Sequence, residues 1–536
     1  YLNESMINYD ERLLKNFYLN KGYYNVVINS SFAKMTNDQE FELIFNIDAN
    51  PKLFFGDLKI DLPNDFSKSN YDEVVKFFNK IENEPYSINR IEDIIEKIET
   101  ITVNEQYESI KASVNENIVS NKININFKIE ETEKFFVQRI NIYGNNVTRE
   151  SVIRNQIEID EGDPFNQILY SKSLNNIKAL NFFEKVEGEI LDGDEFNTKI
   201  INIKITEKAT GEIFAGVGTG TDGSNFAFGI KENNYLGRGV KVDSNLNVSE
   251  ERIKGKLIVS NPNYKNSDKN LDLALEATSI DRVATSGYKS NVTGFSVGTK
   301  FEYLDDLQFG LSTKNTIEKI SVDASASTRQ KKQEGNYFDS FIGLDFFYDK
   351  RNQKYQTTSG FFSAYNMNMP VLSEINTLTN TYNYKIFKEL YENNVSTFSF
   401  LFKSANSLTD DDIKLSERLY IPGKKLRGFE SGKIGPKDGS DFIGGNYVSS
   451  INATTTIPMI LENVQNVDIV MFADAANVWG VDYNGSLDKN GIRSSIGIGI
   501  DWLTAVGPLT FSFAQPITKE PTDIEESFRF NIGTSF

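Results

Sequence analysis

The feature that most constrains the fold is an alternation of apolar and polar residues that recurs through residues 213–536. In one run, Ile496, Ile498 and Trp502 share one face, while Ser495 and Asp501 share the other. A period of two with one apolar and one polar face is typical of antiparallel sheet that is solvated on one side. No helical pattern interrupts this region, which we therefore predict to consist of β-strands and their connections.

Strand length and face composition favour a transmembrane barrel over a soluble sandwich or propeller, which could also alternate. A strand that crosses a membrane needs about 9–11 residues. About sixteen strands would leave about twenty residues for each strand with its connection, enough for short turns on one side and longer loops on the other. Longer loops are expected at 407–417 and 424–445. The polar face is rich in Gly, Ser and Thr, which suits a lumen, and the other face carries aromatic residues, which suit a lipid boundary.

The composition removes several kinds of chemistry. The 536 residues include no cysteine and no histidine, which excludes disulfides, thiolate nucleophiles, His-ligated metals and Ser-His-Asp triads. A net charge of −18 argues against nucleic-acid binding, which needs a basic face. Acidic clusters, such as Asp192 with Asp194 and residues 410–412, lie in turn-like sequence with no accompanying nucleophile. We therefore expect no enzyme activity, no cofactor, no metal and no nucleic-acid partner.

The part of the chain before the alternating region contains an internal repeat. Strand-like runs at 41–47, 123–129 and 201–205 end three similar units at a spacing of about eighty residues. Pro85 and Pro164 mark matching positions in two of these units. Shared markers at one period indicate a single supersecondary unit that is repeated along the chain.

Each repeat is predicted to have the order β-α-α-β-β. In the last repeat, residues 136–143 alternate as a strand, and Thr148 is placed to cap the helix that follows. We assign 1–50 to a partial repeat, 51–132 and 133–212 to complete repeats, and 213–536 to the barrel. The first repeat lacks an opening strand, so we expect the chain to begin inside a domain. Small units of this kind either act as spacers or offer an open sheet edge to which another chain can add a strand.

The two ends of the barrel region carry distinctive sequences. The last residues put large apolar side chains on one face of a final strand: Phe528, Phe530, Ile532 and Phe536. The opening strand is unusually rich in glycine, with Phe214, Gly216, Gly218 and Gly220. Glycine inside a strand weakens its packing and pairing. No Gly-Lys-Ser/Thr follows, so this strand does not read as a phosphate-binding loop.

A third motif, Leu-Arg-Gly-Phe at 426–429, lies in one of the expected longer loops. An arginine inside a polar lumen presents five donors and seeks a carboxylate, and the following glycine permits a tight turn. An Arg-Gly-Phe tripeptide is also common in ordinary hairpin turns, so both interpretations stay open on these residues alone.

Tandem β-α-α-β-β units followed by a C-terminal barrel, together with these motifs, resemble the BamA family of outer-membrane protein assembly factors. The units are similar to the family's polypeptide-transport-associated (POTRA) repeats, and the resemblance covers essentially the whole chain. It implies a multidomain fold of tandem α+β POTRA repeats followed by an antiparallel transmembrane β-barrel of about sixteen strands.

The resemblance also assigns roles to the loop motif. Arg427, Gly428 and Phe429 look like the motif at the tip of the family's long sixth extracellular loop, which folds back into the barrel. Acidic residues on neighbouring strands hold the arginine in that family. Asp474 lies at the matching aspartate position, whereas Thr454 stands where a second acid is expected. The resemblance therefore implies a loop braced by Arg427 and Asp474 alone.

By the same resemblance, the chain inserts β-barrel proteins into the outer membrane of Gram-negative bacteria. The POTRA repeats would lie in the periplasm, with residues 133–212 nearest the membrane. Incoming precursors would add strands to POTRA sheet edges and then to a lateral seam between the first and last barrel strands. The implied partners are unfolded outer-membrane protein precursors, assembly-complex lipoproteins, periplasmic chaperones and outer-membrane lipid.

Two other functions stay open at this point. One is a two-partner secretion translocator or a translocation-assembly protein, which has similar repeats and a similar barrel. Additional POTRA repeats preceding residue 1 would favour the assembly factor over this alternative class of protein. The other is a passive porin or outer-membrane receptor, which steady ion conductance without any effect on membrane-protein assembly would favour.

Overall fold

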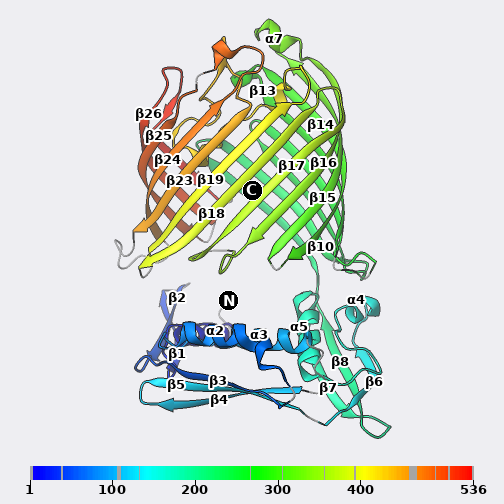
Figure 1. The fold of residues 1–536 in the computed structure, drawn as a ribbon. Helices are drawn as coiled ribbons and strands as arrows, with labels where there is room; N and C mark the ends of the chain where they lie inside the picture. Colours follow the sequence, from blue (N-terminus) through cyan, green and yellow to red (C-terminus); the bar gives the residue numbers. More distant parts are fainter. Residues whose placement is uncertain are drawn as a thin grey trace. The chain divides into compact units, whose positions relative to one another are not determined.

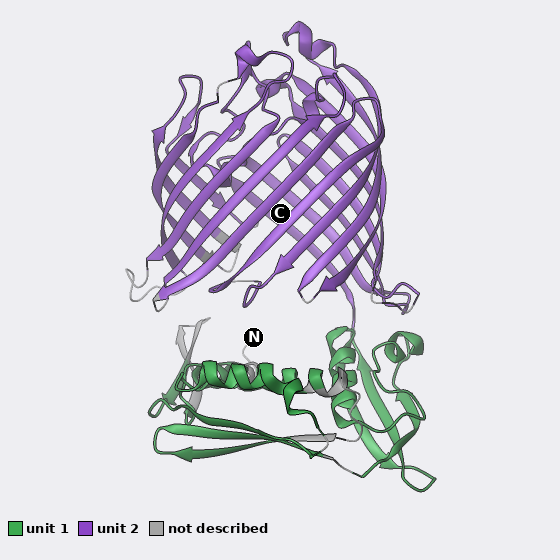
Figure 2. Cartoon of the chain, viewed as in Figure 1, with its two compact units in different colours: residues 1–208 green, residues 209–536 purple. Residues whose placement is uncertain are grey.

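The computed structural model describes residues 4–533 apart from 38–39, 65, 105–109, 132, 266, 268, 305, 355–356, 392–393, 458–466, 489 and 505–506. The chain divides into two compact units, Tyr1–Lys208 and Ala209–Phe536 (Figure 2). None of the described helices is both long enough and apolar enough to cross a membrane.

The first unit begins with one helix and one hairpin. Helix α1 (Glu4–Asn20) is followed by β1 (Val27–Asn37) and β2 (Glu40–Asp48), which pair antiparallel. Strand β2 contains the strand-like run predicted at 41–47.

The middle repeat folds in the predicted β-α-α-β-β order. Its elements are β3 (Phe54–Asp61), the 3-10 turn η1 (Lys68–Tyr71), α2 (Asp72–Ile81), α3 (Ile88–Asn104), β4 (Ile110–Val119) and β5 (Lys122–Glu131). The sheet order is β3-β5-β4, with β3 parallel to β5 and β4 antiparallel to it. Apolar residues at helical spacing in α2, namely Val74, Phe78 and Ile81, are buried in the core of this repeat.

The last repeat has the same architecture. Its elements are β6 (Phe136–Tyr143), α4 (Glu150–Arg154), α5 (Gln167–Ala179), β7 (Phe183–Asp192) and β8 (Thr198–Glu207). The sheet order is β6-β8-β7, which leaves β6 and β7 at the edges of this sheet. Asn166 caps α5 by accepting a hydrogen bond from the backbone N–H of Ile168 at 2.9 Å.

The predicted capping role of Thr148 is wrong. The N-cap of α4 is Arg149, and no side chain makes a capping hydrogen bond there. The backbone N–H of Thr148 instead donates to Oε1 of Glu207 in β8 at 2.6 Å. Thr148 therefore lies one residue before the cap, in a loop that the carboxylate of Glu207 ties to the sheet.

The second unit is a closed antiparallel barrel of sixteen strands, which confirms the predicted fold (Figure 1). Each strand pairs with the next wall strand along the chain, and the last strand closes on the first. The wall strands are β9 (Gly211–Gly220), β10 (Gly223–Tyr235), β11 (Val240–Ser249), β12 (Arg252–Asn261), β13 (Leu271–Arg282), β14 (Tyr288–Leu304), β15 (Leu307–Val322), β16 (Gly335–Asp349), β17 (Gly360–Ser373), β18 (Thr377–Tyr391), β19 (Asn394–Ser407), β23 (Tyr447–Ile457), β24 (Val467–Trp479), β25 (Arg493–Thr504), β26 (Gly507–Thr518) and β28 (Phe528–Ile532).

The alternation in the sequence separates the outer and inner faces of this wall. In β25, Ile496 and Ile498 point outward and are each 53% exposed, whereas Arg493 and Ser495 point inward and are buried. The barrel thus has an apolar outer face and a polar interior, as the period of two predicts.

The connections between strands hold a few short elements. The single-turn helices α6 (Val283–Ser286) and α7 (Thr328–Lys331) were not predicted, because four residues are too few to produce a helical period. Two others are the 3-10 turn η4 (Gly485–Leu487) and the two-residue strand β27 (Glu525–Glu526).

The longest connection, residues 408–446, joins β19 to β23 and contains both segments that the sequence predicts as longer loops, except Ser407, which ends β19. It is called the long loop below. Its short elements are η2 (Leu415–Glu417), η3 (Gly423–Lys425), β20 (Gly428–Phe429), β21 (Lys437–Asp438) and β22 (Asp441–Phe442).

Candidate functional site

Arg427, in the long loop, forms a bidentate ion pair with Asp474 of β24. Its Nε lies 2.7 Å from Oδ2 of the aspartate, and its Nη2 lies 2.8 Å from Oδ1. The backbone N–H of Arg427 also donates to Oδ2 at 3.1 Å. The side chain of Asp474 is fully buried. The structure therefore brings together the two residues that the family resemblance paired.

The rest of the loop motif packs against the inner wall. Gly428 has a φ of +93°, a conformation that residues with side chains rarely adopt. Phe429 is buried in an apolar cluster that includes Val448 of β23. The guanidinium of Arg427 lies over the ring of Phe472, 3.4 Å from its centroid. The loop tip is thus held by an ion pair, by stacking and by apolar burial together.

Asn452, which no sequence motif marks, supports the aspartate. Its Nδ2 donates to Oδ1 of Asp474 at 2.9 Å and to the Lys425 carbonyl at 2.8 Å. Asn452 is the direct register partner of Asp474 across β23 and β24, and Thr454 lies two residues further along the same face. A neutral amide therefore supports Asp474, two residues before the position at which the family pattern suggests a second carboxylate. An Asn in an alternating strand gives no signal of this role, which depends on the register of two strands.

The barrel closes at a seam between β9 and β28. The register pairs across it are Asn531 with Gly220 and Ile532 with Thr219, whereas β9 pairs with β10 from Gly211 to Gly220. Thr221 adds three further bonds. Its N–H and its hydroxyl donate to the Phe530 carbonyl at 3.1 and 3.4 Å, and its Oγ1 accepts from the Phe530 N–H at 2.9 Å. Among the described residues, backbone pairing across the seam is therefore much shorter than between neighbouring wall strands.

The predicted residues on the first strand take different positions. Gly220 lies at the seam, where an added Cβ would come within 2.5 Å of the Phe530 carbonyl oxygen. Gly216 and Gly218 pair with β10. Phe214 also pairs with β10, opposite Gly229, where its ring occupies the space that a side chain would need.

On the last strand, Phe528 packs against Phe513 of β26 with ring centroids 4.8 Å apart. Phe530 pairs with β26 and bonds Thr221 across the seam, and Ile532 pairs with both neighbouring strands. The predicted terminal residue of this strand, Phe536, lies outside the described residues.

The loop motif also pairs with the segment that precedes the last strand. Strand β20 runs antiparallel to β27, with Gly428 opposite Glu526 and Phe429 opposite Glu525. The N–H of Glu430 extends this pairing by donating to the Ile524 carbonyl at 2.9 Å. A two-residue strand has no periodicity, so the sequence could not reveal this contact between the motif and the seam region.

A second buried charge cluster holds the start of the long loop. The Nζ of Lys414 lies 2.5 Å from Asp339, 3.2 Å from Glu318 and 3.3 Å from Glu417. Burial raises the pKa of the Glu417 carboxyl to about 7, against the opposing effect of Lys414. Burial alone would lower the pKa of Lys414, but the three carboxylates together raise it. No local sequence pattern marks this cluster, because its members come from β15, β16 and the long loop.

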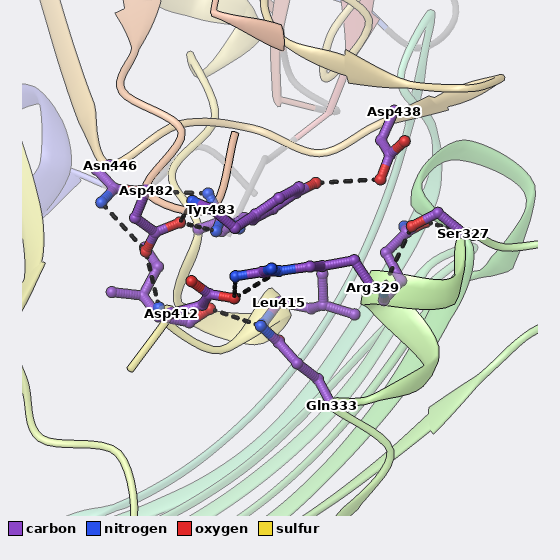
Figure 3. A network of polar contacts seen from close by, with 12 residues as sticks. Ser327, Arg329, Gln333, Asp412, Leu415, Asp438, Asn446, Asp482 and Tyr483 are labelled. Carbon is purple, nitrogen blue, oxygen red and sulfur yellow. Dashed lines mark hydrogen bonds and ion pairs between the residues drawn. The ribbon is translucent and has the colours of Figure 1, made fainter. Parts of the chain in front are cut away.

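Polar contacts also join the long loop to two other connections (Figure 3). Arg329 of α7 donates to Asp412 from Nε at 2.8 Å, and Arg418 forms an ion pair with Asp482. Tyr483 is in cation–π contact with both arginines, with its ring centroid 5.1 Å from Arg329 and 5.0 Å from Arg418. Asp412 belongs to the acidic run at 410–412, which the sequence places in a loop, and its side chain is 22% exposed.

Within the described residues, no group of three or more acidic side chains is arranged to hold a metal ion. The buried carboxylates instead face arginine and lysine, which neutralise them. The arrangement can therefore fix loops inside a barrel and support a short, breakable strand pairing.

Comparison with known proteins defines the family. A family model described as the Omp85 superfamily domain matches residues 234–536. This is more than half of the chain, and the protein belongs to the Omp85 superfamily. A POTRA model, described as a surface antigen variable number repeat, matches residues 1–50 and 135–208.

Individual relatives are similar over most of the chain. The outer membrane protein assembly factor BamA of Neisseria meningitidis is 24% identical over 591 residues, covering 100% of this chain and 73% of the relative. BamA of Neorickettsia risticii is 22% identical with the same coverages. The crystal structure of BamA from Haemophilus ducreyi lacking POTRA domains 1–3 superposes with a TM-score of 0.70 at 22% identity, covering 90% of this chain and 100% of that one. This superposition shows a shared fold.

Proposed function

We propose that this protein assembles β-barrel proteins into the outer membrane of a Gram-negative bacterium. Its membership of the Omp85 superfamily and its similarity to BamA along the whole chain support the proposal. The observation that carries it is the seam: the barrel is closed, yet within residues 4–533 β9 and β28 share two register pairs. A wall with one weak junction can open at that place without unfolding elsewhere.

The chemistry of the reaction is the transfer of backbone hydrogen bonds. A precursor strand in hydrocarbon leaves N–H and C=O groups unpaired, each at a cost of several kcal/mol. An opened seam would offer the free edges of β9 and β28, on which precursor strands can pair one after another. No bond is made or broken covalently, so the protein acts as an insertase and not as an enzyme with catalytic residues.

The POTRA repeats would receive precursors before they reach the barrel. Strand β7 is an edge strand of ten residues, and Glu187 and Glu189 on it are exposed. Main-chain pairing at such an edge makes little demand on sequence, which suits varied precursors. A photo-crosslinking residue at Glu187 should capture a precursor; capture of equal strength at Lys178, exposed on helix α5, would contradict edge pairing.

The partners follow from this role. Unfolded outer-membrane protein precursors are the substrates, periplasmic chaperones deliver them, assembly-complex lipoproteins bind the POTRA repeats, and outer-membrane lipid surrounds the barrel. The ion pair of Arg427 with Asp474 holds the long loop in the lumen.

Reconstitution tests the function itself. The purified protein in liposomes is mixed with an urea-unfolded barrel precursor, and folding is followed by the resistance of the folded product to unfolding in cold detergent gels. We expect folding several times faster than in protein-free liposomes. Unchanged folding together with steady ion conductance would contradict the proposal and favour a passive porin.

A further inference from the structure

Arg529, in the last strand β28, contacts three separate segments of the barrel unit. Its Nη2 donates to the Phe429 carbonyl at 3.1 Å, and its Nη1 donates to Oδ2 of Asp222 at 3.0 Å. Its Nε donates to Glu526 at 2.9 Å. Phe429 belongs to the long loop, Asp222 to the turn between β9 and β10, and Glu526 to β27. One guanidinium therefore joins the loop tip, the first hairpin and the approach to the last strand.

The loop encloses this side chain on one side. The Arg529 side chain is 10% exposed, and a Cβ added to Gly423 of the loop would clash with the guanidinium. The donors of a guanidinium lie in one rigid plane. Holding one donor on the Phe429 carbonyl therefore fixes the direction of the donor that reaches Asp222.

The loop also positions the second carboxylate. Because Gly428 and Phe429 pair with β27, they place Glu526 beside Arg529. If the loop left the lumen, Arg529 would lose the Phe429 carbonyl, and Glu526 would lose the strand that fixes it. Both changes would release the guanidinium from its present orientation.

The bond to Asp222 crosses the seam next to its short backbone pairing. Asp222 follows Thr221, whose N–H and Oγ1 bond Phe530, and Gly220, which pairs with Asn531. Since so few bonds span this junction, one charge-assisted hydrogen bond is a substantial part of what holds the two strands together.

We propose that Arg529 is a positioning residue that links seating of the long loop to closure of the seam. This inference rests on the proposed function, because it concerns how that seam is controlled. With Arg427 seated on Asp474, the loop holds Arg529 toward Asp222 and favours the closed seam. When the loop is displaced, Arg529 turns away and the seam opens more readily. By thermodynamic reciprocity, opening the seam also weakens the seating of the loop.

The expected effect is modest, because water reaches one side of the bond. Asp222 is 55% exposed at its side chain and lines a polar cavity of about 960 Å³ together with Glu430 and Lys433 of the loop. Partly exposed ion pairs shift equilibria by about two- to fivefold, and salt weakens them. The link therefore biases the seam and does not lock it.

Hydrogen exchange of the full-length protein in nanodiscs measures seam opening directly, because amides exchange when their strand pairing breaks. Four variants are compared with the native protein: Arg529→Gln, Asp222→Asn, Arg427→Ala, and Arg427→Ala combined with Arg529→Gln. Segment 215–222 reports on Arg529→Gln, and segment 528–533 reports on Asp222→Asn. Arg351→Gln is the matched control, since Arg351, between β16 and β17 and away from the seam, makes a bidentate pair with Asp349, the last residue of β16.

We expect Arg529→Gln and Asp222→Asn each to raise seam exchange about two- to fivefold at low salt, and Arg351→Gln to leave it unchanged. Arg427→Ala should raise seam exchange in the native background but add little once Arg529 is replaced. If Arg529→Gln fails to fold, as judged by heat modifiability, Asp222→Asn serves alone, because it keeps the contact of Arg529 with the loop. The proposed coupling would be overturned if Asp222→Asn showed the same hydrogen exchange at the seam as the native protein. It would also be overturned if Arg427→Ala raised this exchange equally with Arg529 present and with Arg529 replaced.

This experiment contains no precursor, so its failure differs from failure of the proposed function. If hydrogen exchange at the seam depends on Arg529 as expected but the protein does not insert precursors, the role of Arg529 stands and the proposed function is refuted. If the protein inserts precursors but hydrogen exchange at the seam does not depend on Arg529, only the role of Arg529 is refuted.

Discussion

Arg427 and Asp474 lie 47 positions apart in the chain and meet in a bidentate ion pair, with Nε–Oδ2 and Nη2–Oδ1 distances of 2.7 and 2.8 Å. The aspartate is fully buried, and the arginine is stacked on Phe472. A loop held in this way is part of the barrel's interior and contributes to its stability.

Removal of this pair should destabilise the barrel. Arg427→Ala leaves the carboxylate of Asp474 buried without its counter-ion, which costs about 3–5 kcal/mol. We expect a clear drop in the heat-modification midpoint on detergent gels. Arg351→Gln, which removes a more exposed arginine–aspartate pair, should lower the midpoint by much less. Equal drops in the heat-modification midpoint of the two variants would show that burial of the Arg427–Asp474 pair adds no stability beyond that of a more exposed pair.

The amide of Asn452 should matter more than the hydroxyl of its neighbour Thr454. Asn452→Ala removes donors to Asp474 and to the Lys425 carbonyl and should cost about 1–3 kcal/mol of unfolding free energy. Thr454→Ala, in the same strand and on the same face, is the control and should be nearly neutral. The heat-modification midpoints of the two variants are compared on detergent gels. A lower midpoint for Thr454→Ala than for Asn452→Ala would refute the supporting role of Asn452.

The cluster around Lys414 predicts a pH dependence. Burial raises the pKa of Glu417 to about 7 in the folded protein, while an unfolded glutamate titrates near 4.3. Between these values the folded state keeps a proton that the unfolded state has lost, so stability falls as the pH rises from about 4.5 to about 7. The heat-modification midpoint of the native protein should fall as the pH rises over this interval. The midpoint of the Glu417→Gln variant should fall less. Parallel profiles for the two proteins would mean that Glu417 does not titrate in this range.

Gly220 should be intolerant of a side chain, because its Cβ would meet the Phe530 carbonyl oxygen and the Asn531 Cα. We expect Gly220→Ala to raise hydrogen exchange in segment 528–533 several-fold while the rest of the barrel keeps its protection. Gly255→Ala in β12 is the matched control, since nothing lies within 4 Å of a Cβ there. Unchanged exchange in Gly220→Ala would show that the seam accommodates the methyl group.

The sequence predicted those parts of the fold that depend on periodicity. Alternation in residues 213–536 predicted the barrel, and a repeat of about eighty residues predicted the POTRA order. A prediction for a single residue was wrong where another contact competes. Thr148 was expected to cap α4, but its backbone N–H donates to Glu207 instead.

The site was predictable only where a motif marks it. Arg427 and Asp474 could be paired through a family resemblance, whereas Asn452, Lys414 and Arg529 stand in sequence that looks like ordinary strand or loop. Their roles arise from strand register and from loop folding, which bring together residues such as Arg529 and Asp222, 307 positions apart. No local pattern encodes such contacts.

The most direct test of the account is to lock the seam. Cysteines replacing the register partners Thr219 and Ile532 are the only thiols in the protein, because the native chain has none. Oxidised, this variant should lose precursor insertion in liposomes, and reduction should restore it. A control disulfide between Leu257 and Leu275, register partners of β12 and β13, should leave insertion unchanged. Insertion at the native rate through the oxidised Thr219–Ile532 seam would contradict the proposal that precursors enter the membrane between the first and last strands.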